Sequence, residues 1–239
     1  MNSKQTFMDK LSVLVGTQYG ALLLVLFVHL VLFSFLDHHT VMRWLLDASI
    51  LALIGSAVHA ISGHRWLRTF VIVVGASAIL LGTVGREMEI DVVFPVGALA
   101  KAALYGVVIV VVFKDVLRRR EVDMDAVLGA CCIYLLIGLA WESVYSFIEW
   151  QTPNSFALPA GTPNSGSGAH LVAIQSDLMY FSLITMTTIG YGDITPTSPP
   201  ARVLSALQGV VAQLYVAIII ARLVGMELAH RRDRPSQKR

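Results

Sequence analysis

Long apolar runs separated by short polar segments dominate the pattern of this sequence. A run of about 20 apolar residues is long enough to cross the hydrocarbon core of a bilayer as a helix. By this measure the sequence predicts six membrane-spanning helices, which cover residues 11–36, 44–61, 66–84, 92–113, 126–150 and 201–225. The run at 66–84 has the weakest pattern, because Arg68 lies near its start.

One apolar segment between the last two predicted spans is too short to cross a bilayer. Residues 177–188, DLMYFSLITMTT, follow a loop rich in Pro, Gly, Ser and Asn and precede a stretch with two glycines. We expect Ser176 or Asp177 to cap this short helix, because an acceptor there satisfies free backbone amides. Non-helical backbone at membrane depth is tolerated only beside protein or a water-filled path. The pattern therefore predicts a re-entrant segment.

Composition supports a membrane protein. Of the 239 residues, 56% are hydrophobic and only 14% are charged, whereas a soluble domain is usually about 25% charged. Cys131 and Cys132 are adjacent within an apolar run, which favours packing over a disulfide or a metal site. The sequence has no metal-spaced His/Cys set, phosphate loop or nucleophile motif, so we expect no enzyme activity. The predicted fold class is an all-α integral membrane protein.

With six predicted spans, most of the basic residues fall on one side of the membrane. One side carries Lys4, Lys10, Arg65, Arg68, Lys114, Arg118, Arg119, Arg120, Arg231, Arg232, Arg234, Lys238 and Arg239. The other side carries only Arg43, Arg86 and Arg202. Because cytoplasmic loops are enriched in Lys and Arg, both termini are predicted to be cytoplasmic in a multi-pass plasma-membrane protein. The cluster at 118–120 suits contact with anionic lipids, and no nucleic-acid partner is expected.

Residues 188–192, TIGYG, place glycines on both sides of a tyrosine. Glycine takes positive φ angles at low cost, so Gly190 and Gly192 let the backbone turn successive carbonyl oxygens toward one side. Such a row of oxygens can replace the hydration shell of a potassium ion. One chain supplies too few oxygens to surround an ion, so four chains around an axis are required. The predicted potassium ligands are the backbone oxygens of Thr188, Ile189, Gly190 and Tyr191.

The motif TTIGYGD at 187–193, after a short apolar helix and between two spans, resembles the filter of tetrameric potassium channels. The resemblance covers about 126–226 and implies a homotetramer with a selectivity filter at 188–192, supported by Thr187. It implies passive conduction, with no cofactor beyond the permeant ion. Spans one to four resemble the family only in number and orientation. The chain thus divides into a four-helix domain at 1–120, a pore domain at 121–227 and a basic cytoplasmic tail at 228–239.

The resemblance also assigns roles around the filter. Tyr180 and Phe181 correspond to paired aromatic residues that pack around it; a hydrogen bond from Tyr180 to the filter and simple packing of Phe181 are both considered. Asp193 is placed at the outer mouth, where it concentrates cations and braces the filter. Glu142 either braces the fifth helix against backbone near the filter or reaches the outer interface. Ile184 stands where some relatives carry a glutamate.

The last span contains candidates for an inner gate and cavity. Gly209 is a candidate hinge, although small residues in membrane helices also permit close packing. The usual hinge glycine of the family aligns by count with Ala212 instead. Gln208, Gln213 and Tyr215 interrupt the apolar pattern, and they face either a water-filled cavity or a neighbouring helix.

The fourth span lacks the charge pattern of a voltage sensor. Such a helix carries a basic residue at every third position, and counting in threes through 92–113 meets only Lys101. We therefore expect weak or no voltage sensing. A potassium-selective channel is the predicted function. The alternatives are a non-selective cation channel and a non-conducting or partner-dependent subunit that retains the pore fold.

Overall fold

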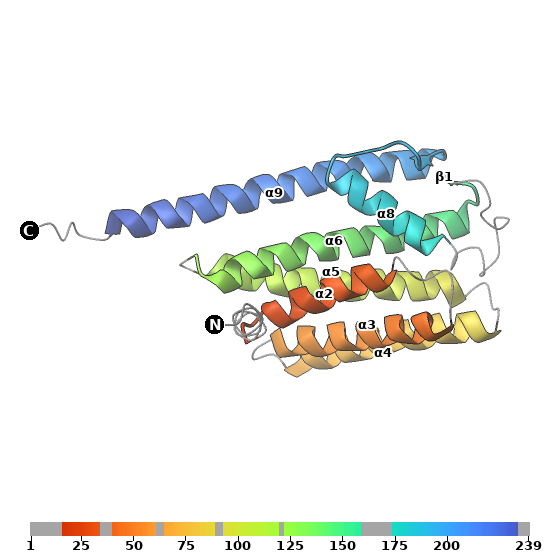
Figure 1. Cartoon of the computed structure of the whole chain (residues 1–239), viewed down its shortest axis with the longest axis horizontal. Helices are drawn as coiled ribbons and strands as arrows, with labels where there is room; N and C mark the ends of the chain where they lie inside the picture. Colours follow the sequence, from red (N-terminus) through yellow and green to blue (C-terminus); the bar gives the residue numbers. More distant parts are fainter. Residues whose placement is uncertain are drawn as a thin grey trace, which may run out of the picture.

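Helices make up nearly all of the chain that the computed structural model describes, which is residues 16–33, 40–60, 65–88, 93–119, 122–158 and 174–233. In chain order the elements are α2 (Gly20–Phe33), α3 (Thr40–Ala60), α4 (Arg65–Met88), α5 (Val93–Arg118), α6 (Met124–Gln151), β1 (Phe156–Ala157), α8 (Gln175–Met186), β2 (Thr195–Pro196) and α9 (Pro199–Asp233). Figure 1 shows α2 to α6 as a bundle of roughly aligned helices, with α8 and α9 along one side of α6.

Within the described residues, four helices are long and apolar enough to cross a membrane: Arg65–Val84, Val93–Arg118, Met124–Gln151 and Pro199–Leu228. The first two predicted spans contain shorter apolar helices, Gly20–Leu32 and Leu45–His59. Part of the first predicted span, 11–36, lies outside the described residues, so the count of six stays a prediction. The short helix predicted at 177–188 is present as α8.

Local sequence explains where the two long helices α6 and α9 begin. Asp123 caps α6, because its carboxylate accepts a hydrogen bond from the backbone amide of Ala126 at 2.8 Å. Pro199 and Pro200 open α9, at positions where a missing amide hydrogen costs no helical hydrogen bond. α9 then continues to Asp233, beyond the predicted end at 225. Residues 228–233, predicted as the start of a tail, are therefore helical.

The core has two parts, and α6 contributes to both. The larger part joins α2, α3, α5 and α6 through buried side chains such as Leu22, Leu53, Leu104, Val112 and Ile133. The smaller part lies beside α8 and contains Tyr145, Ile148, Phe156, Leu178 and Phe181. β1 and β2 pair antiparallel there, with Phe156 opposite Pro196. This second part of the core fixes α8 and the segment that follows it against α6.

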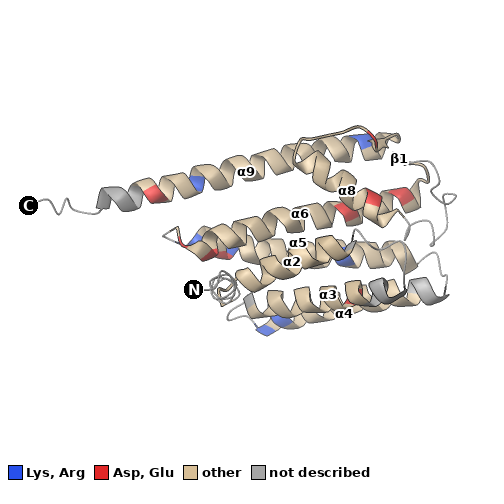
Figure 2. Ribbon diagram, viewed as in Figure 1, with Lys and Arg blue, Asp and Glu red and all other residues tan. Residues whose placement is uncertain are grey.

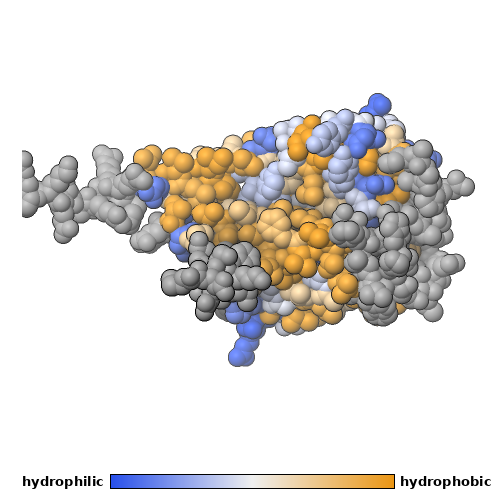
Figure 3. Space-filling view, in the orientation of Figure 1, coloured by the Kyte–Doolittle hydropathy of each residue, from blue (hydrophilic) through white to orange (hydrophobic). Residues whose placement is uncertain are grey.

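The outer surface is apolar over much of its length. No Lys, Arg, Asp or Glu occurs in α2, or in α9 between Arg202 and Arg222 (Figure 2). Hydrophobic side chains cover most of the visible surface of α9 on that stretch (Figure 3), and large ones such as Val203, Leu214 and Ile220 are more than half exposed. A surface of this kind requires lipid or another protein chain to cover it.

Candidate functional site: the segment after helix α8

The chain between α6 and α9 enters and leaves the bundle at the same end. Figure 1 shows α8 running part of the way along the molecule, after which an extended segment returns to the end where α9 begins. The amino end of α8 differs from the prediction. Its N-cap is Ile174, with no side-chain cap, so Ser176 and Asp177 lie within the first turn instead. The carboxylate of Asp177 is still favourable there, because it faces the positive end of the helix dipole.

The returning segment has an alternating backbone. The φ angle is +62° at Thr188, +53° at Gly190 and +81° at Gly192. The residues between them, Ile189 and Tyr191, are not among the described residues with positive φ. Alternation of this kind turns successive carbonyl groups toward the same side. The positive φ predicted for the two glycines is confirmed, whereas that of Thr188, a β-branched residue that rarely adopts it, was not foreseen.

Carbonyl groups at the end of α8 hold the start of this segment. The amides of Ile189 and Gly190 both donate to the carbonyl of Ile184, at 3.0 and 3.2 Å. The amide of Thr188 donates to the carbonyl of Thr185 at 3.1 Å. The last carbonyls of a helix have no partner within the helix, so these bonds satisfy the helix end and fix the path of the chain beyond it.

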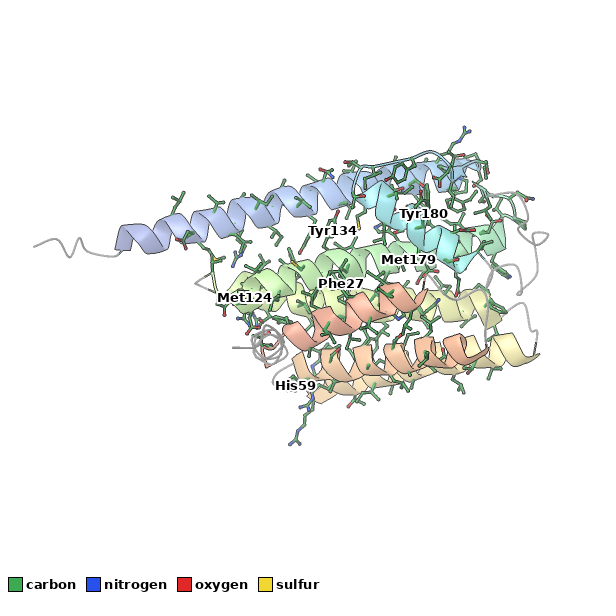
Figure 4. All side chains as sticks on the ribbon, viewed as in Figure 1. Phe27, His59, Met124, Tyr134, Met179 and Tyr180 are labelled. Atoms are coloured by element: carbon green, nitrogen blue, oxygen red, sulfur yellow. The ribbon has the colours of Figure 1, made fainter. Side chains whose placement is uncertain are left out.

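Side chains around α8 add further contacts. The hydroxyl of Thr187 donates to the carbonyl of Leu183 at 2.8 Å. From α6, the hydroxyl of Tyr134 donates to the carbonyl of Met186 at 3.3 Å, and Figure 4 labels Tyr134 between α6 and α9. No sequence motif predicts the hydrogen bond from Tyr134, because this bond depends on how α6 packs against α8.

The aromatic pair on α8 performs two different tasks. The hydroxyl of Tyr180 donates to the carboxylate of Asp193 at 2.8 Å, which ties α8 to the end of the returning segment. Phe181 is buried, and its ring lies 5.3 Å from the rings of Tyr145 and Phe156. The structure therefore contains a hydrogen bond from Tyr180 and simple packing of Phe181.

Glu142 and Glu149, in the second half of α6, are both buried. Glu142 is 1% exposed and accepts hydrogen bonds from the hydroxyls of Ser146 at 2.9 Å and Ser143 at 3.2 Å, both in its own helix. It thus does not reach the outer interface, and among the described residues no backbone amide near the returning segment donates to it. Glu149, near the end of the same helix, is also 1% exposed.

Glu149 has the bracing role that was considered for Glu142. Its carboxylate accepts hydrogen bonds from the backbone amides of Asn154 at 2.8 Å and Phe156 at 3.2 Å. Both donors lie just beyond the end of α6, where the chain turns back through β1 to pair with β2. A hydrogen-bonded carboxylate therefore fixes the carboxyl end of α6 to the chain that leads into the strand pair.

The candidate gate residues of α9 lie in different surroundings. Ala212 is fully buried in the core of the chain, whereas Gln213 is exposed. A Cβ atom added to Gly209 would meet nothing within 4 Å, so its own chain does not require a glycine there. Tyr215 donates to the carbonyl of Ala130 at 2.7 Å. Hinge or cavity roles for Gly209, Ala212 and Gln213 stay predictions.

The basic cluster predicted to contact lipids is partly engaged within the chain. The guanidinium of Arg119 forms ion pairs with Asp115 at 3.2 Å, with Asp123, and with Asp125 at 3.8 Å. Arg118 is exposed, and Arg120 lies outside the described residues.

Within the described part of the chain, no group of three or more His, Cys, Asp or Glu side chains could hold a metal ion.

A short helix and a glycine-containing return between two long apolar helices define the class of protein as a membrane protein with a re-entrant segment. Residues 173–227 match the family model described as "Ion channel". The chain is 38% identical over 72 residues to Two pore potassium channel c of Oryza sativa subsp. japonica, which is 30% of this chain and 15% of that protein. These matches support the assignment of this chain to a potassium channel family.

Two further relatives match parts of the chain. Potassium voltage-gated channel subfamily A member 10 of Mus musculus is 29% identical over 98 residues, which is 41% of this chain and 16% of that protein. Protein LctB of Bacillus caldotenax is 30% identical over 91 residues, which is 38% of this chain and 64% of that protein. The chain thus spans less than two thirds of each of these relatives. No solved structure matches the chain significantly.

Proposed function

We propose that the protein is a potassium-selective channel, in which four copies of the segment 188–192 surround a single ion path. The observation that carries the proposal is the alternating backbone at Thr188, Gly190 and Gly192, directly after a short apolar helix. The backbone oxygens of residues 188–191 would replace the hydration shell of a potassium ion. The permeant ion is the only cofactor proposed.

A homotetramer follows from the number of oxygens that an ion needs. One chain provides a single row, whereas a dehydrated potassium ion must be surrounded on all sides. Exposure supports the same assembly, because Ile189 is 54% and Tyr191 is 72% exposed on the single chain. Neighbouring copies would cover these two side chains, while their α9 helices line the path below.

The proposal includes six spans, both termini in the cytoplasm and location in the plasma membrane. The segregation of basic residues supports this orientation. Voltage sensing is proposed to be weak, because Lys101 is the one basic residue in the middle of α5. A single charge moved through the whole field contributes about 2.3 kcal/mol per 100 mV.

The test is the reversal potential of the purified protein in a planar bilayer with potassium on one side and sodium on the other. A value near the potassium equilibrium potential is expected. A value near zero with clear current would mean a non-selective cation channel. Absence of current across the tested voltages, with an intact tetramer in the bilayer, would favour the non-conducting or partner-dependent subunit.

A further inference from the structure

A buried carboxamide joins three helices behind the proposed filter. Gln208 of α9 is fully buried, and its Nε2 atom donates to both the carbonyl and the hydroxyl of Ser182 in α8, at 3.1 and 2.8 Å. Its Oε1 atom accepts a hydrogen bond from the hydroxyl of Tyr145 in α6. Both the donor and the acceptor atom of the carboxamide are therefore used within the chain.

Ser182 extends this contact back to α6. Its hydroxyl donates to the carbonyl of Gly138 at 2.8 Å. The absence of a side chain at Gly138 permits the close approach, because a Cβ atom there would lie 3.0 Å from the Leu183 Cδ2 atom of α8. Gln208, Ser182, Tyr145 and the carbonyl of Gly138 thus form one hydrogen-bonded group, called here the Gln208 network, which fixes α8 between α6 and α9.

The Gln208 network includes a residue that is close in sequence to the carbonyl group that holds the filter. Ser182 is two residues before Ile184, whose carbonyl accepts the amides of Ile189 and Gly190. The three residues 182–184 belong to one helix, so a displacement of Ser182 moves the carbonyl of Ile184 with it. The position of the filter backbone therefore depends on the position that Gln208 gives to α8.

We propose that Gln208 is a positioning residue for ion selectivity, which holds the filter at the width that potassium requires. The inference rests on the proposed channel function and adds a determinant outside the filter. An unpaired amide in an apolar interior is costly, so any movement of α8 that breaks these hydrogen bonds is opposed. Gln208 itself contacts no permeant ion, and it acts through Ser182.

The permeability ratio of potassium to sodium tests this role. Gln208→Leu removes every hydrogen bond of the carboxamide at similar volume, and we expect the ratio to fall about tenfold, with the tetramer preserved. Tyr145→Phe removes one bond and leaves both bonds to Ser182, so a smaller fall is expected. Ser77→Ala is the matched control, because its hydroxyl donates to Val74 within α4 at 2.8 Å.

The outcomes separate this inference from the channel proposal. A wild-type protein without selectivity would contradict the proposed function itself. A selective wild-type protein with an unchanged ratio in Gln208→Leu would overturn the role of Gln208 alone. If Gln208→Leu does not assemble, Ser182→Ala decides, since it removes the bonds of the hydroxyl and leaves the carboxamide its bonds to Tyr145 and to the carbonyl of Ser182. An unchanged ratio in that variant would also overturn the inference.

Discussion

Three residues with positive φ define the backbone of the proposed filter, and only one of them is not a glycine. Gly190 and Gly192 adopt positive φ without a steric penalty. Thr188 adopts it with a β-branched side chain, at a cost of about 1–2 kcal/mol. The hydrogen bonds that the next two amides donate to Ile184 offset this cost. The strain is thus held by the helix end directly before the filter.

Gly190→Asp is expected to abolish potassium conduction. Residue 190 has a backbone conformation that favours glycine, so an aspartate there is strained. The new carboxylate would also lie next to the proposed ion path. No atom of the same chain lies within 4 Å of the added Cβ, so insertion of the single chain should persist. Potassium flux into liposomes is the measurement. Gly106→Ala is the control, because that helical glycine is also without neighbours within 4 Å. Wild-type flux in Gly190→Asp would contradict the filter assignment.

Glu149→Gln is expected to destabilise the outer end of α6. An amide oxygen can still accept one of the two backbone bonds, but the amide nitrogen cannot accept the other, at a cost of about 1–3 kcal/mol. The melting temperature of the purified protein should fall. Glu142→Gln should lower it less, because Ser143 also donates to the carbonyl of Leu139. Equal shifts for the two variants would show that Glu149 has no special structural role.

The sequence was sufficient to predict some of these residues and not others. Positive φ at Gly190 and Gly192 was predictable, because few residues other than glycine adopt it readily. Burial of Glu149 was not, because its amide donors at Asn154 and Phe156 are positioned only when the chain turns back and β1 pairs with β2. The hydrogen bonds of Gln208 and Tyr134 likewise depend on packing between helices, which leaves no local pattern.

At the scale of elements, α9 contacts the rest of the chain at both of its ends. Near its start, Gln208 binds α8. Near its far end, the guanidinium of Arg222 donates to the carbonyls of Val116 at 3.4 Å, Leu117, and Arg119 at 3.3 Å. A helix ends with carbonyls that have no partner within it and with a partial negative charge. Arg222 satisfies both at the end of α5, and so connects α9 to α5.

Arg222→Gln is expected to loosen the end of α5. Loss of the charge and of the shared donor leaves the carbonyls of Val116, Leu117 and Arg119 without this partner, so the last turn of α5 should open more often. Amide hydrogen exchange in that turn should become faster, as measured by mass spectrometry. Arg118→Gln is the control, because Arg118 is exposed beside the same turn. Identical exchange in Arg222→Gln and wild type would contradict a capping role for Arg222.

Element boundaries were predicted unevenly, for physical reasons. The short helix was predicted because its apolar run is too brief to cross a bilayer, and α8 is present. The predicted N-cap of this helix was wrong, because the helix begins at Gln175, before the expected polar residues. The end of α9 was placed too early, at 225, because hydropathy falls where the helix leaves the apolar region, although the helix itself continues to Asp233.

At the scale of the whole molecule, the single chain leaves apolar side chains uncovered on its surface. Exposed apolar residues on α9, such as Leu207, Leu214 and Ile218, lie on the same helix as the buried Gln208 and Ala212. Lipid acyl chains could cover an apolar helix surface, but they have no oxygen atoms to offer to a potassium ion. The exposed backbone of 188–192 therefore favours other copies of the chain as its partners.

Potassium is expected to stabilise the proposed tetramer more than sodium does. An ion that binds the assembled filter but not separate chains raises the stability of the assembly by mass action, by about 2.7 kcal/mol at 100 times its dissociation constant. The tetramer should therefore dissociate at a higher temperature in KCl than in NaCl of equal concentration, as followed by gel electrophoresis after heating. Gly190→Asp, if it still assembles, should lose this difference. Equal dissociation temperatures for the wild type, or a solution mass near the 26.1 kDa of one chain, would contradict a filter built by four copies.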